Sequence, residues 1–262
     1  MLAATSEEGG LPVPTMGEFF PPALGLDGTI FEFNRITLVR LLAAVVLCLL
    51  FWLAARRATL VPGRAQSIAE IGLDFVRVNI AEEVLGKHHA RPYVPLLTVM
   101  FWAILAMNIT GVVPGLNIAS TSVVAVPLIL AVVAWLVFVG TGIKQHGVLG
   151  YLGASLFPKG VPWPLYIILA PIELISTFIL RPVTLTVRLM ANMLAGHMLL
   201  VTFFLMTSYL FVEASGALKA MGLVTFGAAF AFTIFEIFIA ALQAYIFTLL
   251  TAVYINLSQE AH

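Results

Sequence analysis

Long runs of apolar residues divide this chain, and the length of each run predicts how it meets a membrane. Residues 36–55 form one such run, and residues 92–110 and 122–142 form two more. Each is close to the roughly 20 residues that a helix needs to cross a bilayer. The pattern therefore predicts three membrane-crossing helices in the first part of the chain.

Two apolar runs in the last part of the chain are much longer, covering about residues 165–212 and 220–257. A run well above roughly 20 residues must tilt, kink or fold into a bent hairpin to stay within the bilayer. Pro171 and Pro182 supply kink sites in the first of them, because proline removes a helical hydrogen bond. We expect two long, strongly tilted helices here.

Residues 66–86 mix charged and apolar positions at helical spacing. One face of a helix built from this segment carries four apolar residues, namely Ile68, Ile71, Phe75 and Val78. The charged residues Glu70 and Arg77 fall on the opposite face. This pattern predicts an amphipathic helix that lies along the membrane interface without crossing it.

Composition supports a membrane protein. Of the 262 residues, 61% are hydrophobic and 10% are charged, whereas soluble domains carry about 25% charged residues. The formal net charge is zero, and no basic cluster with interleaved aromatics occurs, so nucleic acid is not an expected partner. The single cysteine, Cys48, excludes an intrachain disulfide.

Charge placement predicts the orientation. Residues 1–34 are polar and contain no Lys or Arg, whereas Arg56, Arg57 and Arg64 follow the first apolar run. By the positive-inside rule, the N-terminal segment is expected outside and the arginines in the cytoplasm. Arg40 is close enough to one end of its run to extend toward the interface. Five crossings would then leave the C-terminus in the cytoplasm.

The expected fold class is therefore an all-α polytopic membrane protein, with about five membrane-embedded helices and one interfacial helix. We divide it into residues 1–34, a polar outside segment, and residues 35–160, which hold the first crossing, the interfacial helix and a helical pair. Residues 161–262 form the two long tilted helices. No P-loop, dinucleotide-binding motif or HExxH is present, which argues against ATP binding and a catalytic zinc.

The two long runs hold most of the polar groups expected inside the membrane. The first carries Glu173, Arg188, Asn192 and His197, and the second carries Glu236, Gln243 and Tyr254, with Asn108 in an earlier crossing. Arg188 is the most informative, because a guanidinium at the bilayer centre costs about 2.5–3.5 kcal/mol at the least. Since arginine keeps its proton in proteins, it is a fixed charge and not a proton carrier.

Helical spacing sorts these groups by face. Arg188 and Asn192 are four residues apart and share a face, while His197 falls on the opposite side about 13 Å further along the axis. Glu236, Gln243 and Tyr254 form one stripe on the last helix. Two structural alternatives remain open at this point. Arg188 could form a salt bridge with Glu173 or Glu236, and the stripe could provide interhelical hydrogen bonds.

Other function classes are weaker. His88 and His89 near Glu82 and Glu83 suggest a metal site, but charged residues at an interface explain them better. An intramembrane protease built on this cluster would need a zinc arrangement that the spacing does not match. A self-contained secondary transporter would need internal repeats, and none is visible.

Two segments resemble a known family. RPVTLTVRLMANMLAGH at 181–197 and FEIFIAALQAYIFTLLTAVYINL at 235–257 closely resemble the signature of subunit a of F-type ATP synthases, the stator subunit that faces the rotating c-ring. MNITGVVPG at 107–115 resembles the family's NxxGxxPG. The order of segments along the whole chain also matches. Ala191 stands where the family commonly has glycine, which should alter close packing and not charge handling.

The resemblance implies a role for each matching residue. Arg188 corresponds to the essential stator arginine opposite the c-ring carboxylate, and Asn192 and Gln243 to its polar neighbours. His197 and Glu236 correspond to the paired imidazole and acid of the outer half-channel. Glu173 resembles an acidic position on the cytoplasmic path, and Tyr254 and Asn108 remain possible secondary polar groups.

The implied function is proton translocation through two offset half-channels separated by Arg188, in a multi-pass protein of a bacterial-type plasma membrane. The implied partners are c-ring subunits, b-type peripheral stalk subunits and membrane lipid. No cofactor or metal is expected, and the chain should not be catalytic on its own.

Overall fold

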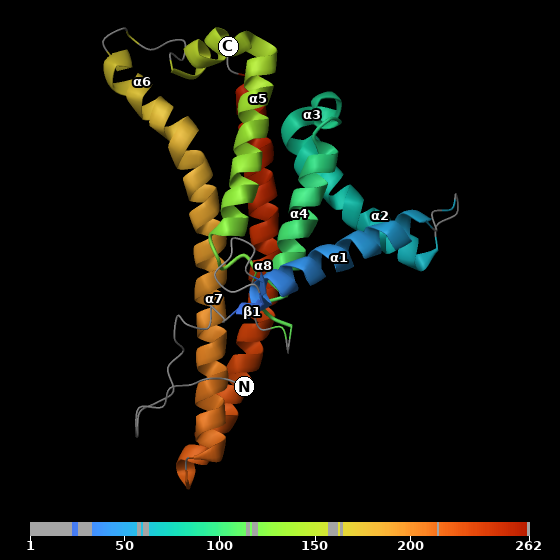
Figure 1. Cartoon of the computed structure of the whole chain (residues 1–262), viewed down its shortest axis with the longest axis vertical. Helices are drawn as coiled ribbons and strands as arrows, with labels where there is room; N and C mark the ends of the chain where they lie inside the picture. Colours follow the sequence, from blue (N-terminus) through green and yellow to red (C-terminus); the bar gives the residue numbers. More distant parts are fainter. Residues whose placement is uncertain are drawn as a thin grey trace. The chain divides into compact units, whose positions relative to one another are not determined.

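The computed structural model describes residues 23–25, 33–56, 59, 63–113, 116, 120–156, 162, 165–213 and 215–260. The fold is almost entirely helical (Figure 1). Two short strands, β1 (Ala23–Gly25) and β2 (Phe33–Asn34), pair antiparallel. They are the described part of the predicted polar segment 1–34, and the rest of that segment lies outside the described residues.

The helices follow the apolar runs closely. Their bounds are α1 Arg35–Arg56, α2 Arg64–Val76, the π-helix η2 Arg77–Glu82, α3 Glu83–Ala90, α4 Val94–Ile109, α5 Ala125–Leu156, α6 Tyr166–Ile175, the π-helix η4 Ser176–Leu180, α7 Arg181–Val212 and α8 Ala217–Glu260. Among the described residues, four helical stretches are long and apolar enough to cross a membrane, and α4 is a shorter apolar helix. The predicted fold class, an all-α polytopic membrane protein, is confirmed.

The segment predicted as one interfacial helix is built from three pieces. α2 carries the amphipathic pattern, the π-helical turn η2 follows it, and α3 continues to Ala90, beyond the predicted end at 86. Gly86 lies inside α3 with φ 73°, a conformation that favours glycine, and it breaks the helix there. Two residues of the apolar face, Ile68 and Ile71, are 72% and 70% exposed, so this face remains available to lipid or to another protein.

Helix α5 extends past the predicted end of its crossing at Gly142. The helix reaches His146, and Gly147 then adopts φ 72° and redirects the chain into a further helical segment. This change of direction lays the ring of Tyr151 against Gly142, where no side chain stands in the way. Residues 143–156, which follow the predicted crossing, are therefore helical with a break at Gly147.

The first long run forms one continuous helical stretch, consisting of α6, η4 and α7. The π-helical turn η4 lies between Pro171, inside α6, and Pro182, the second residue of α7. Pro182 has no N–H to give the carbonyl of Phe178, which explains why the regular α pattern is interrupted at this point. The prolines therefore mark the irregular region, as predicted.

The chain divides into two compact units, and α1, α4, α7 and α8 each contribute residues to both. The first unit comprises residues 1–45, 105–123 and 190–242. Within it, the second part of α7 and the first part of α8 form a helical hairpin (Figure 1). Thr207 donates to Thr225 across the hairpin at 3.0 Å, and the rings of Phe203 and Phe232 lie 5.3 Å apart.

The α4–α5 connector is also in the first unit and carries a buried polar network. Arg40 donates to the Ser120 carbonyl at 3.1 Å through Nη2, and Arg35 donates to the Leu116 carbonyl at 3.0 Å. Arg40 therefore ties α1 to the connector. Among the described residues, the connector side chains Thr110 and Ser120 are buried, and their hydroxyls satisfy one another at 3.4 Å.

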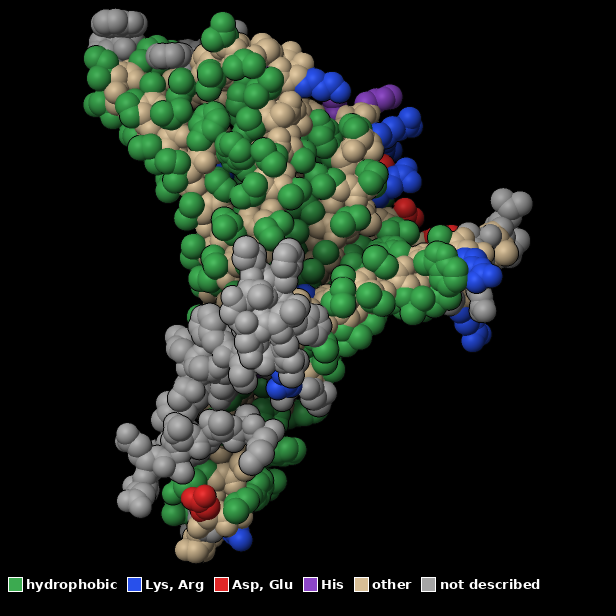
Figure 2. Space-filling view, in the orientation of Figure 1, with side chains coloured by type: hydrophobic (Ala, Val, Ile, Leu, Met, Phe, Trp, Pro, Cys, Tyr) green, Lys and Arg blue, Asp and Glu red, His purple; other side chains and the backbone are tan. Residues whose placement is uncertain are grey.

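The second unit comprises residues 46–104, 124–189 and 243–262. Helix α8 ends here against α4 and α5, where the Gln259 side chain donates to the Tyr93 hydroxyl at 3.3 Å. The Gln259 carbonyl in turn accepts from Gln145 at 3.1 Å. Figure 2 shows Lys, Arg and His side chains gathered over α3, while hydrophobic side chains cover the visible face of α6. This distribution is typical of a body embedded in lipid with charged groups at its edge.

Candidate ion-translocation site

Arg188 lies in the second turn of α7, and its side chain is exposed. The possible salt bridge with Glu173, which belongs to the same unit, is not formed, although Glu173 is half-buried. The guanidinium therefore stands on the outer surface of a helix long and apolar enough to cross a membrane. An unshielded cation in such a place is costly unless another charged group or water meets it.

Small residues accompany Arg188 along the exposed side of α7. Thr184, Ala191 and Ala195 are exposed at the helical spacing that puts them on the same side, and Leu199 continues this line. Small side chains allow a second helix to approach closely in a membrane. We call these five positions, Thr184, Arg188, Ala191, Ala195 and Leu199, the arginine stripe.

Glu236 is buried, whereas Arg188 is exposed. It lies in the middle of α8, its side chain is 2% exposed, and neither carboxylate oxygen has a hydrogen-bond partner among the described residues. A Cβ placed on Gly196 of α7 would lie only 3.3 Å from its Oε1 atom. The carboxyl group is therefore packed against the backbone of α7, and the absence of a side chain at Gly196 makes room for it.

His197 follows Gly196 directly on α7 and is 4% exposed. The structure thus brings the carboxyl group of Glu236 to the α7 segment that carries His197, within one unit. The two groups are the acid and the imidazole that the sequence pattern paired. Buried side chains that can each gain and lose a proton are suited to relay protons when water reaches them.

The amide side chains of Asn192 and Gln243 differ in burial. Gln243 is buried on α8, seven residues beyond Glu236, whereas Asn192 is half-buried on α7, one helical turn beyond Arg188. Both have polar or electrostatic interactions within the described chain.

Tyr254 contacts the cation of Arg181. The guanidinium of Arg181 lies 5.0 Å from the centre of the Tyr254 ring and 5.8 Å from that of Phe138. The two rings are themselves 5.7 Å apart. Arg181, the first residue of α7, therefore contacts aromatic rings of α5 and α8. Helical periodicity within one segment does not reveal such contacts between helices.

Asn108 of α4 binds the backbone of a helix that is distant in the sequence. Its side-chain amide donates to the Ala240 carbonyl of α8 at 3.4 Å and accepts from the Thr121 hydroxyl. Ala240 lies one turn beyond Glu236. The buried network of the connector therefore ends on the α8 segment that carries the acid.

No cluster of three or more metal-ligating side chains occurs within the described ranges, so Glu82, Glu83, His88 and His89 are not gathered into one. Sequence reasoning missed Gly196 and the ring contacts of Arg181. For Gly196 a signal was available, because glycine inside a long helical run often marks a close approach of other atoms. For Arg181 no signal existed, since its partners come from helices far away in sequence.

Comparisons with known proteins identify the family of this chain. Residues 37–256 match the family model described as ATP synthase A chain. ATP synthase subunit a of Rhodococcus erythropolis (strain PR4 / NBRC 100887) is 47% identical over 248 residues, covering 95% of this chain and 90% of that protein. The subunits a of Parafrankia sp. (strain EAN1pec) and Streptomyces lividans are 43% and 35% identical, and cover 88% and 97% of this chain and 78% and 89% of their own lengths. The chain therefore belongs to the ATP synthase A chain family.

Proposed function

We propose that this chain is the proton-translocating stator subunit of a rotary F-type ATP synthase. It provides two offset half-channels to a carboxylate on the c-ring, and Arg188 separates them. Family membership supports a role in the membrane sector of the synthase. The observation that carries the finer proposal is the exposed guanidinium of Arg188 on a helix long and apolar enough to span the membrane.

Arg188 faces the rotor in this mechanism. The arginine stripe supplies a line of mostly small residues against which a helix of the c-ring can pack. An ionised carboxylate on the rotor is stabilised next to the guanidinium, and it can leave only after it takes a proton and becomes neutral. The permanent positive charge also repels a hydrated proton, so that protons cannot pass directly between the two half-channels.

The outer half-channel leads to Glu236 and His197. The polar network that runs from Arg40 through the connector to Asn108 approaches α8 at Ala240, next to Glu236. Polar groups buried in this way are more compatible with water than the apolar surface around them. Protons enter along this path, pass over Glu236 and His197, and reach the rotor carboxylate, with Asn192 and Gln243 as its polar neighbours.

The cytoplasmic half-channel is assigned to the side of Glu173. Glu173 is half-buried on α6, and Arg181 marks the start of α7 between Glu173 and Arg188 in the sequence. A proton released from the rotor carboxylate after almost a full turn leaves by this path. Because one charge moved through 100 mV is worth about 2.3 kcal/mol, several protons must pass for each ATP made.

The third part of the chain, residues 161–262, holds this machinery. The proposed partners are the c-ring subunits against α7 and the b-type peripheral stalk subunits that hold the stator still. The chain itself has no catalytic site in this proposal and needs no cofactor. Its proposed location is a bacterial-type plasma membrane, with the N-terminus outside and the C-terminus in the cytoplasm.

Arg188→Ala tests the proposal when it is introduced into the assembled complex. Inverted membrane vesicles are given ATP, and proton uptake is followed with a pH-sensitive dye. We expect proton uptake to be lost. The matched control is Arg64→Ala, which removes an exposed arginine from α2 and should pump normally. Normal coupled pumping by Arg188→Ala, at an equal amount of assembled complex, would show that the arginine does not gate the path.

A self-contained secondary transporter is the competing function. It predicts that the purified chain alone moves a solute across a liposome membrane in response to a gradient. The stator proposal predicts no such transport without the c-ring, because the two half-channels do not meet. Counterflow measurements on the purified chain separate the two.

A further inference from the structure

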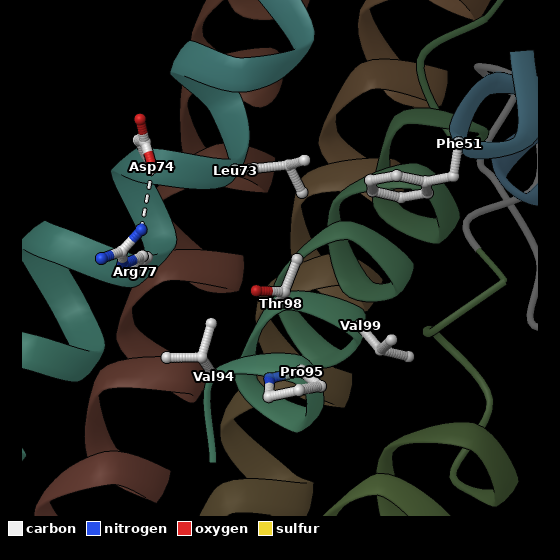
Figure 3. Close-up of a pocket in the computed structure, with 8 residues that line it drawn as sticks. All are labelled: Phe51, Leu73, Asp74, Arg77, Val94, Pro95, Thr98 and Val99. Carbon is white, nitrogen blue, oxygen red and sulfur yellow. Dashed lines mark ion pairs between the residues drawn. The ribbon is translucent and has the colours of Figure 1, made fainter. Parts of the chain in front are cut away.

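A cavity of about 450 Å³ lies between the end of α1, helix α2 and the first turns of α4 (Figure 3). Its wall is mainly apolar: Phe51 comes from α1, Leu73 from α2, and Val94, Pro95 and Val99 from α4. Thr98 adds one hydroxyl. This volume falls within the range of about 300–1,000 Å³ that small-molecule sites occupy. All of these residues belong to the second unit.

One edge of the cavity is charged. Asp74 and Arg77 line it together, both more than half exposed, with Arg77 Nη1 and Asp74 Oδ1 4.0 Å apart. Glu82 accepts from Nε of Arg77 at 2.8 Å, and this bond and the charge of Glu82 raise the pKa of the guanidinium above its usual value. The bond to Glu82 uses Nε, so the terminal nitrogens of Arg77 retain donors for a further acceptor.

The sequence next to the cavity is typical of the level where headgroups and acyl chains meet. Helix α4 begins at Val94, and the exposed residues Lys87 and Arg91 immediately precede it. Cations placed just before a membrane-entering helix lie at the level of lipid phosphates. Val94, Pro95, Thr98 and Val99 belong to the first turns after that level, at the depth of the upper acyl chain.

We propose that this cavity binds one phospholipid whose headgroup carries a phosphate and a primary ammonium. One acyl chain occupies the apolar space beside Phe51, Leu73 and Thr98. The phosphate accepts from the terminal nitrogens of Arg77, a charge-assisted bond that suits a guanidinium. The ammonium lies against Asp74. Because Arg77 Nη1 is 4.0 Å from Asp74 Oδ1, the carboxylate can still accept a hydrogen bond from the ammonium.

The charges at the edge favour this headgroup over an anionic one. Asp74 and Glu82 supply two negative charges against the one positive charge of Arg77. A purely anionic headgroup would meet Arg77 favourably and be repelled by both carboxylates. A headgroup with both signs of charge complements both members of the Asp74–Arg77 pair.

The test uses the full chain in vesicles that contain a trace of phosphatidylethanolamine with a photoreactive acyl chain. After illumination, mass spectrometry locates the labelled peptides. We expect labelling concentrated on the peptides that contain Leu73 and Val94–Val99. Thr98→Trp, which fills the cavity, and Arg77→Gln should each lower this labelling about tenfold, the equivalent of one charge-assisted hydrogen bond.

Two matched variants control for general effects. Ile129→Trp adds the same ring at an exposed position on α5, and Arg64→Gln removes an exposed arginine from α2. Neither residue lines the cavity, so neither should reduce labelling. Labelling that spreads evenly over all lipid-facing helices, or that Thr98→Trp and Arg77→Gln leave unchanged, overturns the proposal.

The headgroup is tested by replacing the probe with photoreactive phosphatidylglycerol. Wild-type labelling should be about threefold weaker with this anionic probe, and Asp74→Asn should remove the difference. Stronger labelling by the anionic probe contradicts the proposed headgroup. The experiment is then repeated on membranes that contain the whole assembled complex. If cavity labelling disappears there, a protein helix covers the cavity, and the lipid proposal is wrong.

Discussion

Replacing Gly196 with Ala tests whether the contact between Glu236 and α7 matters for proton transfer. The new methyl carbon would lie 3.3 Å from Oε1 of Glu236, 3.6 Å from Cδ and 3.7 Å from Cγ. Contacts between carbon atoms are optimal at about 3.5–4.0 Å, so only the contact with Oε1 is too short. The carboxyl group must therefore move away from α7 by a few tenths of an ångström.

The effect on stability should be small. Overpacking of a buried contact costs about 1–3 kcal/mol, while alanine is better than glycine inside a helix by about 1 kcal/mol. These two effects oppose each other, so Gly196→Ala should accumulate in the membrane and assemble nearly as well as the wild type. The effect on function should be larger, because misplacement of a reacting group by about 1 Å reduces rates up to a hundredfold.

We expect ATP-driven proton uptake into inverted vesicles to fall about tenfold in Gly196→Ala. Gly227→Ala is the matched control, because Gly227 lies on α8 in the same unit and has nothing within 4 Å of a new Cβ. That variant should pump at the wild-type rate. Equal rates in both variants would refute the reasoning, since they would show that the position of the Glu236 carboxyl group against α7 is irrelevant.

A double variant identifies the cause of the loss. Glu236→Asp shortens the acid by one methylene and withdraws its carboxyl group from Gly196. In the Gly196→Ala background this should relieve the contact, so that the double variant pumps faster than Gly196→Ala alone. Strictly additive losses would instead mean that the two residues act independently.

Three further predictions concern stability. Asn108→Leu removes the bond from α4 to α8 and should lower the free energy of unfolding in detergent by about 1 kcal/mol, measured by denaturant titration. Gly142→Ala places a methyl group in the ring of Tyr151 and should lower the thermal midpoint, whereas Gly140→Ala, with open space around its Cβ, should not. Arg181→Gln removes a cation held between two aromatic rings and should cost about 1 kcal/mol, which Arg181→Lys should partly restore in the same thermal assay.

The sequence predicted the membrane helices well because their signal is local. A run of apolar residues must be long enough to cross the bilayer, and its backbone must satisfy its own hydrogen bonds, so α1 and α4 begin and end close to the expected residues. The errors occurred at Gly86 and Gly147. Both adopt positive φ inside helical stretches, and no local pattern distinguishes such a break from a tolerated glycine.

The candidate site was predictable in composition but not in contacts. Spacing placed Glu236 and Gln243 on one side of α8, and both are buried. The contact of Glu236 with Gly196 and the bond from Asn108 to Ala240 join segments far apart in the sequence. Helical periodicity says which face a residue occupies, but it does not say which helix lies opposite.

In the proposed mechanism, the exposure of Arg188 and the burial of Glu236 suit opposite tasks. A fixed charge that must act on a moving carboxylate has to stand at the surface of the stator, because a buried guanidinium would be tied to a partner of its own chain. An acid that passes protons along an access path must instead be enclosed, so that protons reach it only from one side. The family resemblance alone does not require this contrast between the two residues. The structure provides it through an exposed line of small residues around Arg188 and a side-chain-free position at Gly196 against Glu236. It follows that a larger side chain at Ala191 or Ala195 should impair contact with the rotor. A larger side chain at Gly196 should instead impair the transfer of protons through Glu236 to the rotor carboxylate.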